Sequence, residues 1–314
     1  MNTTKYTFLL PAYKPNFLEE ALESIKNQTY PNFKVIVSDD SSPHDLKLIF
    51  DKVCSGDSRF AFRRNPANMG GKSLVSHWNL LVDMCDTEYF VMASDDDVYM
   101  PEFLEEADKL LTKYPKVHLL RARSQEIDGN GVVRHTEKVT EEYLDTLHFI
   151  HRIYQDDWAG GVASFVYRTE TLRSKGKFVD FPSAWFSDDV TNFLMADYGC
   201  CITQQITFHV RNSDVNISGQ WGNPEDSRKK VAATYMNYHW MKKFMVQFEN
   251  ETDKDFVETV TKEYRQKIYN NIQNYIYSCS FVDFMRFLWQ CPNDLGLFKP
   301  RMLAHYLRVH LKSY

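Results

Sequence analysis

Residues 89–104, YFVMASDDDVYMPEFL, decide how the rest of this chain is interpreted. The first five residues form a short apolar run that predicts a buried strand, and this run leads into three consecutive carboxylates, Asp95, Asp96 and Asp97. A helix is expected to follow, because Pro101 and Glu102 are typical of a first helical turn. In open α/β sheets, ligands bind where strands end, since loops converge there while the buried sheet stays rigid. The stretch therefore predicts a ligand site at the three carboxylates.

Three adjacent carboxylates repel one another, and placing them beside a buried strand adds a desolvation cost. A hard divalent cation would offset both effects. Mg²⁺ or Mn²⁺ is typically held by one or two carboxylates together with phosphate oxygens of a substrate. The alternative is a solvated turn in which Asp97 or a neighbour caps the next helix, and these residues alone leave both interpretations open.

The strand–loop–helix pattern recurs through the first 115 residues. Apolar strands are expected at 6–10, 34–37, 59–62 and 89–93, with helices between them, the first opened by a capping box of Asn16 and Glu19. Such alternation predicts βαβ units and a mostly parallel sheet, and right-handed crossovers bring the loops after the strands to one edge. The candidate residues at this edge are Pro11, Ala12, Tyr13, Asp39, Asp40, Lys72, Asp95, Asp96 and Asp97.

After residue 115 the alternation weakens. Strands are expected on both sides of the DGNG turn at 128–131, at 162–167 and at 202–210, and a helix is expected to open at Ser187 or Asp188. From Glu225 onward the apolar spacing predicts helices. We therefore expect an α/β fold with a Rossmann-like, mixed, mostly parallel sheet flanked by helices. The expected parts are a first half at 1–115, a second half of the same domain at 116–222 and a helical extension at 223–314.

Composition narrows the possible functions. The chain has 314 residues, of which 43% are hydrophobic, which is enough for a sizeable core. Its net charge of -5 argues against nucleic-acid binding, which needs a basic face. Residues 1–11 do not resemble a signal peptide, and no apolar run in the sequence reaches the roughly 18 residues needed for a membrane span, so neither is expected. Its six dispersed cysteines fit reduced thiols in a cytoplasmic protein.

A second location stays open, at the inner face of a membrane. The helix expected near 297–312 is amphipathic and basic, which suits peripheral contact with an anionic membrane surface. The alternative for this helix is docking on the core with a solvated face.

Four loops together resemble the nucleotide-sugar half of family 2 glycosyltransferases, which have the A-type fold. They are LPAYKP after the first strand, VSDDSS after the second, NPANMGG before the third helix and ASDDDVYMP after the fourth strand, in that order over residues 6–104. The SDD at 187–189 extends the resemblance. The resemblance implies that residues 1–115 are the nucleotide-sugar-binding half and residues 116–222 the acceptor-binding half of one domain. The helices after about residue 220 match no motif of the family.

The resemblance implies a role for each matching position. Asp96 has the metal-ligand position of the family's Asp-x-Asp motif. The first Asp of that motif is Ser94 here, so the second carboxylate is either Asp95 or Asp97. Asp40, or Asp39, would accept from a base N–H, and Lys72 at a helix start would neutralise diphosphate. The implied nucleotide-binding residues are Pro11, Ala12, Tyr13, Asp39, Asp40, Lys72 and Asp95.

In the family, the catalytic base is an Asp that begins a helix in the second half of the domain. Asp189 in WFSDDVTNF has the matching place, with Asp188 as a supporting carboxylate. The alternative role for both is to complement the helix dipole. The implied acceptor-binding residues are Trp158, Gly160, Gly161, Trp185 and Arg211, although aromatic residues and glycines also serve in cores and turns.

The expected activity is metal-dependent, inverting transfer of a sugar from a nucleotide-diphosphate donor, with a UDP-sugar as first choice and Mn²⁺ or Mg²⁺ as cofactor. The acceptor would be a hydroxyl of a glycan or lipid-linked glycan, as in polysaccharide or surface-glycan synthesis. The alternative is a non-catalytic module that binds a nucleotide-sugar or carbohydrate on the same fold. A P-loop is disfavoured, because Pro66 stands where the motif that NMGGKS resembles needs Gly.

Overall fold

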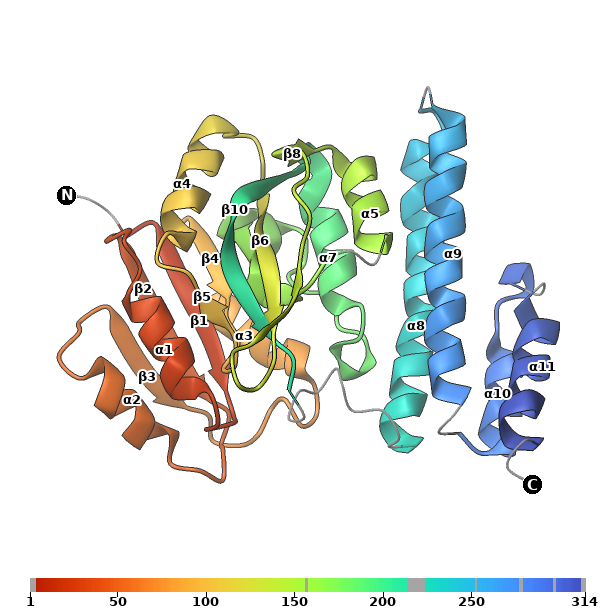
Figure 1. Cartoon of the computed structure of the whole chain (residues 1–314), viewed down its shortest axis with the longest axis horizontal. Coiled ribbons are helices and arrows are strands. Elements are labelled where there is room, and N and C mark those ends of the chain that lie inside the picture. Colours follow the sequence, from red (N-terminus) through yellow and green to blue (C-terminus); the bar gives the residue numbers. More distant parts are fainter. Residues whose placement is uncertain are drawn as a thin grey trace. The chain divides into compact units, whose positions relative to one another are not determined.

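The computed structural model describes residues 4–155, 158–213, 224–251, 253–276, 279–295 and 298–311 (Figure 1). The chain divides into two compact units. The first contains Met1–Asp180 and Thr191–Ser213, and the second contains Phe181–Val190 and Asp214–Tyr314. Helix α7 (Ser187–Met195) begins in the second unit and ends in the first.

The first unit contains a mixed sheet of ten strands. The strands are β1 (Tyr6–Ala12), β2 (Phe33–Asp39), β3 (Phe60–Arg64), β4 (Tyr89–Met92), β5 (Val98–Tyr99), β6 (Leu119–Ile127), β7 (Val133–Thr136), β8 (Tyr143–Leu144), β9 (Phe165–Arg168) and β10 (Cys200–Arg211). Their order is β3-β2-β1-β4-β9-β6-β10-β5, with β7 beside β6 and β8 beside β10. β1 pairs in parallel with β2 and β4, and β2 pairs in parallel with β3. β9 is antiparallel to both its neighbours, β4 and β6, and β6 is parallel to β10. The predicted mostly parallel, mixed sheet is confirmed.

Helices cover both faces of this sheet (Figure 1). They are α1 (Leu18–Lys26), α2 (Leu46–Cys54), α3 (Leu74–Met84), α4 (Phe103–Lys113), α5 (Thr146–Tyr154) and α6 (Thr169–Ser174), with 3₁₀ turns η1 (Val162–Ser164) and η3 (Ala196–Tyr198). Alternate residues of a strand point to opposite faces. Phe8 of β1 accordingly packs in one cluster with apolar residues of α1, α2 and α4. On the other face, Phe178 contacts Trp78 of α3 and Phe90 of β4.

Two local predictions are corrected. The capping box of Asn16 and Glu19 is wrong, since α1 begins at Leu18 after Phe17 and no side chain caps it. The strand predicted at 162–167 begins only at Phe165, because residues 162–164 form η1. This turn closes with a hydrogen bond from Ser164 N–H to the carbonyl of Gly161 at 3.0 Å.

The second unit is helical in its described part beyond residue 223. After the turn η2 (Pro182–Ala184), it contains α8 (Pro224–Phe244), η4 (Met245–Phe248), α9 (Lys254–Ile276), α10 (Phe281–Gln290), η5 (Asn293–Leu295) and α11 (Phe298–Leu311). α8 and α9 lie side by side as a long helical pair (Figure 1). Tyr235 of α8 donates its hydroxyl to the carbonyl of Phe287 in α10 at 2.7 Å. None of the helices in the described residues combines the length and apolar character that crossing a bilayer requires.

Helix α11 packs within its own unit. The ring of Tyr306 stacks on Phe284 of α10 with centroids 4.3 Å apart, and Met302 is buried. Leu303 and Leu307 of the same helix are exposed. Part of the apolar surface that suggested membrane contact is therefore used to dock the helix.

Candidate functional site

The two acidic loops lie next to each other at one edge of the sheet. Asp39 ends β2 and Asp40 follows it, the carboxylate loop (residues 94–97) follows β4, and β1 lies between these strands. Asp40 N–H donates to the carbonyl of Ala12 at the end of β1, at 2.9 Å. On the other side of β1, Asp95 Oδ2 accepts from the backbone N–H groups of Tyr13 and Lys14, at 2.8 and 2.9 Å. The loop after β1 is thus bonded to both acidic loops.

Asp40 is almost fully buried, with 4% of its surface exposed. Its Oδ1 accepts from Met69 N–H at 2.9 Å and from the Asn65 side chain at 2.8 Å, and its Oδ2 accepts from Gly70 N–H at 2.7 Å. Burial by itself raises the pKa of Asp40, but these bonds and the nearby His77 ring outweigh burial, so the pKa is lowered. Asp40 therefore holds the NPANMGG loop, and its contact with a nucleobase stays a prediction.

Asp39 shapes the turn that follows β2. Its Oδ1 accepts from Ser42 N–H at 2.8 Å, and its Oδ2 pairs with Arg64. Between them Ser41 has a φ of 57°, a left-handed conformation that is uncommon outside glycine. The side chain of Asp39 is buried, so its predicted contact with a base also stays a prediction.

The three carboxylates of the carboxylate loop differ in environment. Asp97 is 6% exposed and its Oδ1 accepts from Arg211 N–H at 2.9 Å. Burial, then the charge of Asp96, raises the pKa of Asp97 well above its usual range. Burial also raises the pKa of Asp95, against the hydrogen bonds from Tyr13 and Lys14. Asp96 is partly exposed and, in the described part of the chain, accepts from the Ser94 hydroxyl. Among the three, Asp96 is the partly exposed carboxylate to which no backbone N–H donates within the described residues.

Arg211 supports the carboxylate loop through hydrogen bonds from its backbone and its side chain. Its guanidinium is buried and donates to the carbonyls of Asp96 at 2.8 Å and Asp128 at 3.2 Å, and to Glu20 at 2.5 Å. The ring of Phe17 lies 4.3 Å from its Cζ. These contacts give Arg211 a structural role, and a direct contact with a ligand stays a prediction.

The other predicted residues of the first unit are more accessible. Tyr13 and Lys72 are exposed, and no ion pair of Lys72 occurs within the described ranges. Trp158 is half-buried, with its ring 4.1 Å from Cζ of Arg121. Gly160 is exposed and has a φ of 103°, which excludes most other residues.

The predicted base belongs to the second unit. Asp188 and Asp189 are in the first turn of α7, as predicted, and both are half-buried. Burial, reinforced by the Asp188 carboxylate and opposed by Lys267 of α9, raises the pKa of Asp189 to about 7. A carboxylate with this pKa can accept a proton near neutral pH.

The chain that leads to Asp189 has an unusual backbone. Ser183, Ala184 and Phe186 have φ values of 57°, 54° and 65°. Left-handed conformations outside glycine are strained, and such strain gathers at functional sites. Between these residues, the Trp185 ring lies 4.9 Å from the ammonium of Lys230. No glycine or asparagine in the sequence signals this conformation.

A divalent cation would need ligands from outside the chain as well. The described residues contain no group of three His, Cys, Asp or Glu side chains that could hold a metal ion. Mg²⁺ and Mn²⁺ sites with one or two carboxylates plus substrate phosphates do not require such a group. The oxygen donors of Asp96, with Asp95 beside it, fit that second kind of site.

Residues 7–179, which are more than half of the chain, match the family model "Glycosyl transferase family 2". The chain belongs to glycosyl transferase family 2. The A-type fold of this family, expected from the four loops, agrees with the observed sheet.

Relatives in the family match part of the chain. An uncharacterized glycosyltransferase of Methanocaldococcus jannaschii is 31% identical over 117 residues, which are 37% of this chain and 39% of that protein. The GalNAc(5)-diNAcBac-PP-undecaprenol beta-1,3-glucosyltransferase of Campylobacter jejuni is 29% identical over 94 residues, which are 30% of each chain. The matches thus span less than half the length of these relatives.

Solved structures show the same fold over nearly the whole chain. S. aureus TarS, in complex with UDP-GlcNAc, has a TM-score of 0.62 at 15% identity, over 97% of this chain and 88% of that chain. The mannosyltransferase PcManGT of Pyrobaculum calidifontis, in complex with GDP-Man and Mn²⁺, has a TM-score of 0.57 at 15% identity, over 99% of this chain and 87% of that chain. At this identity the likeness establishes the fold alone.

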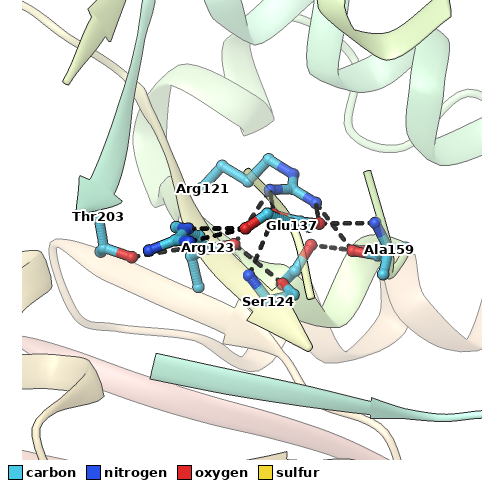
Figure 2. A network of polar contacts seen from close by, with 9 residues as sticks. Arg121, Arg123, Ser124, Glu137, Ala159 and Thr203 are labelled. Carbon is cyan, nitrogen blue, oxygen red and sulfur yellow. Dashed lines mark hydrogen bonds and ion pairs between the residues drawn. The ribbon is translucent and has the colours of Figure 1, made fainter. Parts of the chain in front are cut away.

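The family motifs in the sequence did not predict two groups of residues that support the site. The first group is Asn65, whose side chain donates to Asp40 Oδ1, and His77, whose Nδ1 lies 3.7 Å from the same oxygen. The polar His77 on the buried face of α3 is a signal that sequence could have given. The second group is the buried ion pair of Arg121 and Glu137, which hydrogen-bonds to Ala159 next to Trp158 (Figure 2).

Replacing Asp40 by Asn should destabilise the fold by about 1–3 kcal/mol at neutral pH, because the amide cannot accept all three hydrogen bonds. The folded pKa of Asp40 is lowered, so its stabilisation is fully present above the unfolded pKa of about 4 and is lost as pH falls through the folded value. Urea unfolding of both proteins at neutral pH and at about pH 3 measures this.

The control is Asp51→Asn, which removes an exposed carboxylate paired with Lys47 and should change stability by less than about 1 kcal/mol. An Asp40→Asn protein as stable as the wild type at neutral pH would contradict the role of Asp40 in holding the loop.

Proposed function

We propose that this chain is a metal-dependent, inverting glycosyltransferase that moves a sugar from a nucleotide-diphosphate donor to a hydroxyl of a glycan. The observation that carries the proposal is the pair of hydrogen bonds from Tyr13 and Lys14 to Asp95, since it joins the loop after β1 to the carboxylate loop at one edge. Membership of family 2 supports the same activity. The name of the Campylobacter jejuni relative supports a lipid-linked glycan as acceptor.

The donor is proposed to be a UDP-sugar, held by the loops after β1 and β2. TarS binds UDP-GlcNAc, which supports this choice, while GDP-Man in PcManGT is the alternative. Asp96 and Asp95 would hold Mn²⁺ or Mg²⁺, and exposed Lys72 would face the diphosphate. When bound, the cation supplies positive charge that stabilises the leaving diphosphate.

Asp189 is proposed as the base that removes the proton from the acceptor hydroxyl. Its raised pKa supports this role, because a general base works best with a pKa near the working pH. Asp188 supports Asp189 by raising that pKa. Trp158, Gly160, Gly161 and Trp185 are the proposed acceptor-contacting residues.

A two-step experiment tests the proposal. Thermal shifts with UDP, GDP, dTDP and CMP, with Mn²⁺, Mg²⁺ or EDTA, identify the nucleotide, since a ligand of the folded state raises the Tm. Transfer from the matching sugar nucleotides to p-nitrophenyl glycosides then measures activity. A metal-dependent shift without transfer or donor hydrolysis favours the non-catalytic module, and no shift with any nucleotide contradicts both the transferase and a nucleotide-sugar-binding module.

Replacing Asp96 by Asn should weaken metal-dependent nucleotide binding by more than about 10-fold, because the negative charge and one of the two carboxylate oxygens are lost. The matched control is Asp97→Asn, which keeps an oxygen for Arg211 N–H in a buried position and should bind within about threefold of wild type. Isothermal titration of UDP with Mn²⁺ measures both. Equal losses in the two variants would contradict the assignment of the cation to Asp96.

Replacing Asp189 by Asn should lower the transfer rate by about 10²–10⁴-fold while donor affinity stays within a few fold. In the wild type the rate should rise with pH and level off above about 7, because the base must be deprotonated. Asp188→Asn removes a charge that raises this pKa, so it should move the inflection to lower pH. Initial rates over a pH series test this, and an inflection unchanged in Asp188→Asn would refute the assignment.

A membrane contact is also proposed, through α10 rather than α11 alone. Phe281, Val282, Met285 and Trp289 form an exposed apolar face on α10, and Trp289 is 87% exposed. Arg286 lies within this face, and its side chain is exposed. An apolar helix face with tryptophan and a basic residue suits the surface of an anionic bilayer.

Trp289→Ser combined with Val282→Ser should reduce sedimentation with vesicles of phosphatidylcholine and phosphatidylglycerol by at least about fivefold, because the apolar contact is lost. Val246→Ser, in η4, is the control, since Val246 is an exposed apolar residue outside α10 and α11. Sedimentation of the double variant at the wild-type level would exclude α10 as the contact.

A further inference from the structure

Arg121 of β6 and Glu137, which follows β7, form an ion pair whose two side chains are 2% and 1% exposed. Glu137 Oε2 accepts from Arg121 at 2.7 Å and from Ser124 N–H at 3.0 Å. Its Oε1 accepts from the second Arg121 nitrogen and from Ala159 N–H, the latter at 2.6 Å. Arg121 also donates to the carbonyl of Ala159 at 2.8 Å. Figure 2 shows both backbone groups of Ala159 bonded to this pair.

The pair determines the conformation of the 158–161 segment, which has no helix or strand of its own. Ala159 is fixed by its N–H and its carbonyl, and the Trp158 ring covers the Arg121 guanidinium at 4.1 Å. Exposed Gly160 comes directly after these anchors, at a φ of 103°. The position of the exposed backbone at Gly160 is therefore set by two buried charges.

This segment leads to the carboxylate loop. β9 begins just after η1 and pairs antiparallel with β4, with Val166 opposite Val91. The turn η1 itself also contacts β4, the strand that leads into the carboxylate loop. Tyr99, just beyond that loop, donates its hydroxyl to the carbonyl of Ala163 at 2.9 Å.

The sheet order assigns the segment to one side of the site. The loops proposed to bind the nucleotide follow β1 and β2, on one side of β4, whereas η1 and β9 lie on the other side. A donor whose diphosphate is held at the carboxylate loop, with its nucleoside over β1 and β2, directs its sugar toward the β9 side. The 158–161 segment is on that side.

We propose that Arg121 and Glu137 are positioning residues for the sugar-acceptor side of the site, acting through the backbone of residues 158–161. This inference rests on the proposed function. Replacing a buried ion pair by apolar residues often costs no stability, so stability alone does not explain the pair. The hydrogen bonds from Arg121 and Glu137 to Ala159 give the pair a function that apolar residues could not replace.

The test compares Arg121→Lys with wild type in the full chain. Lysine keeps the charge beside Glu137 but cannot bond Glu137 twice and reach the Ala159 carbonyl as well. We expect at least a tenfold rise in KM for the p-nitrophenyl glycoside acceptor, or a tenfold fall in kcat, with the Kd of UDP and Mn²⁺ within twofold. Amide exchange of peptides covering 158–164 should become at least tenfold faster, while peptides covering β1 and β2 keep their wild-type exchange rates.

Arg123→Met is the matched control. Arg123 donates to the carbonyls of Glu137 and Gln204 in the same network but has no bond to residues 158–161 (Figure 2). It should leave acceptor KM and exchange at 158–164 at wild-type values. A double variant, Arg121→Met with Glu137→Leu, removes the buried charges together, so that a folded protein without the Ala159 bonds can be assayed. It should repeat the kinetic effect.

The outcomes separate the two proposals. Transfer by the wild type with unchanged acceptor KM, kcat and exchange in Arg121→Lys overturns the positioning role and leaves the proposed function intact. If the Kd of UDP and the acceptor KM rise by the same factor in Arg121→Lys, the positioning role is also overturned, because such a result indicates a general structural role. Absence of transfer and of donor hydrolysis in the wild type overturns the proposed function, and the positioning role with it.

Discussion

The cost of burying carboxylates at the edge of an apolar sheet governs this structure. Asp39, Asp40, Asp95 and Asp97 all lie where buried strands end, and an uncompensated charge there would be expensive. Each is compensated by backbone N–H groups from another loop or the next turn. The donors are the backbone N–H groups of Ser42, Met69, Gly70, Tyr13, Lys14 and Arg211. The acidic residues therefore fix the loops of the edge in place.

This arrangement changes how the acidic run should be understood. From the sequence alone, the three adjacent charges could be compensated by a cation or exposed to solvent in a turn that caps the next helix. In the structure, backbone N–H groups donate to Asp95 and Asp97, whereas in the described chain Asp96 accepts from the Ser94 hydroxyl. These hydrogen bonds hold the loop, and a cation bound at Asp96 would add binding capacity to it. Preorganised loops of this kind bind charged ligands with little reorganisation.

The sequence predicted most of the sheet because periodic apolar residues and loop motifs report on local structure. The strands after 6, 34, 59 and 89 and the helix opened at Ser187 follow from patterns a few residues long. The antiparallel insertion of β9 between β4 and β6 does not, since it depends on contacts far apart in sequence. The capping box at Asn16 failed because the chain enters α1 through Phe17, whose ring packs on Arg211. Glu137 stands in a polar stretch, HTEKVTEE, where nothing marks it as buried.

The buried pair of Arg121 and Glu137 also supplies hydrogen-bond partners to buried polar groups, but here the groups that need partners are in the backbone. Ala159 is buried in irregular backbone, so its N–H and carbonyl have no strand or helix partners, and each would cost free energy if left unpaired. Apolar side chains could fill the space but could not bond these groups. A carboxylate for the N–H and a guanidinium for the carbonyl satisfy both, and each neutralises the other. At the carboxylate loop, backbone N–H groups hold the side-chain charges of Asp95 and Asp97 in place. At Ala159, the side-chain charges of Arg121 and Glu137 hold the backbone in place.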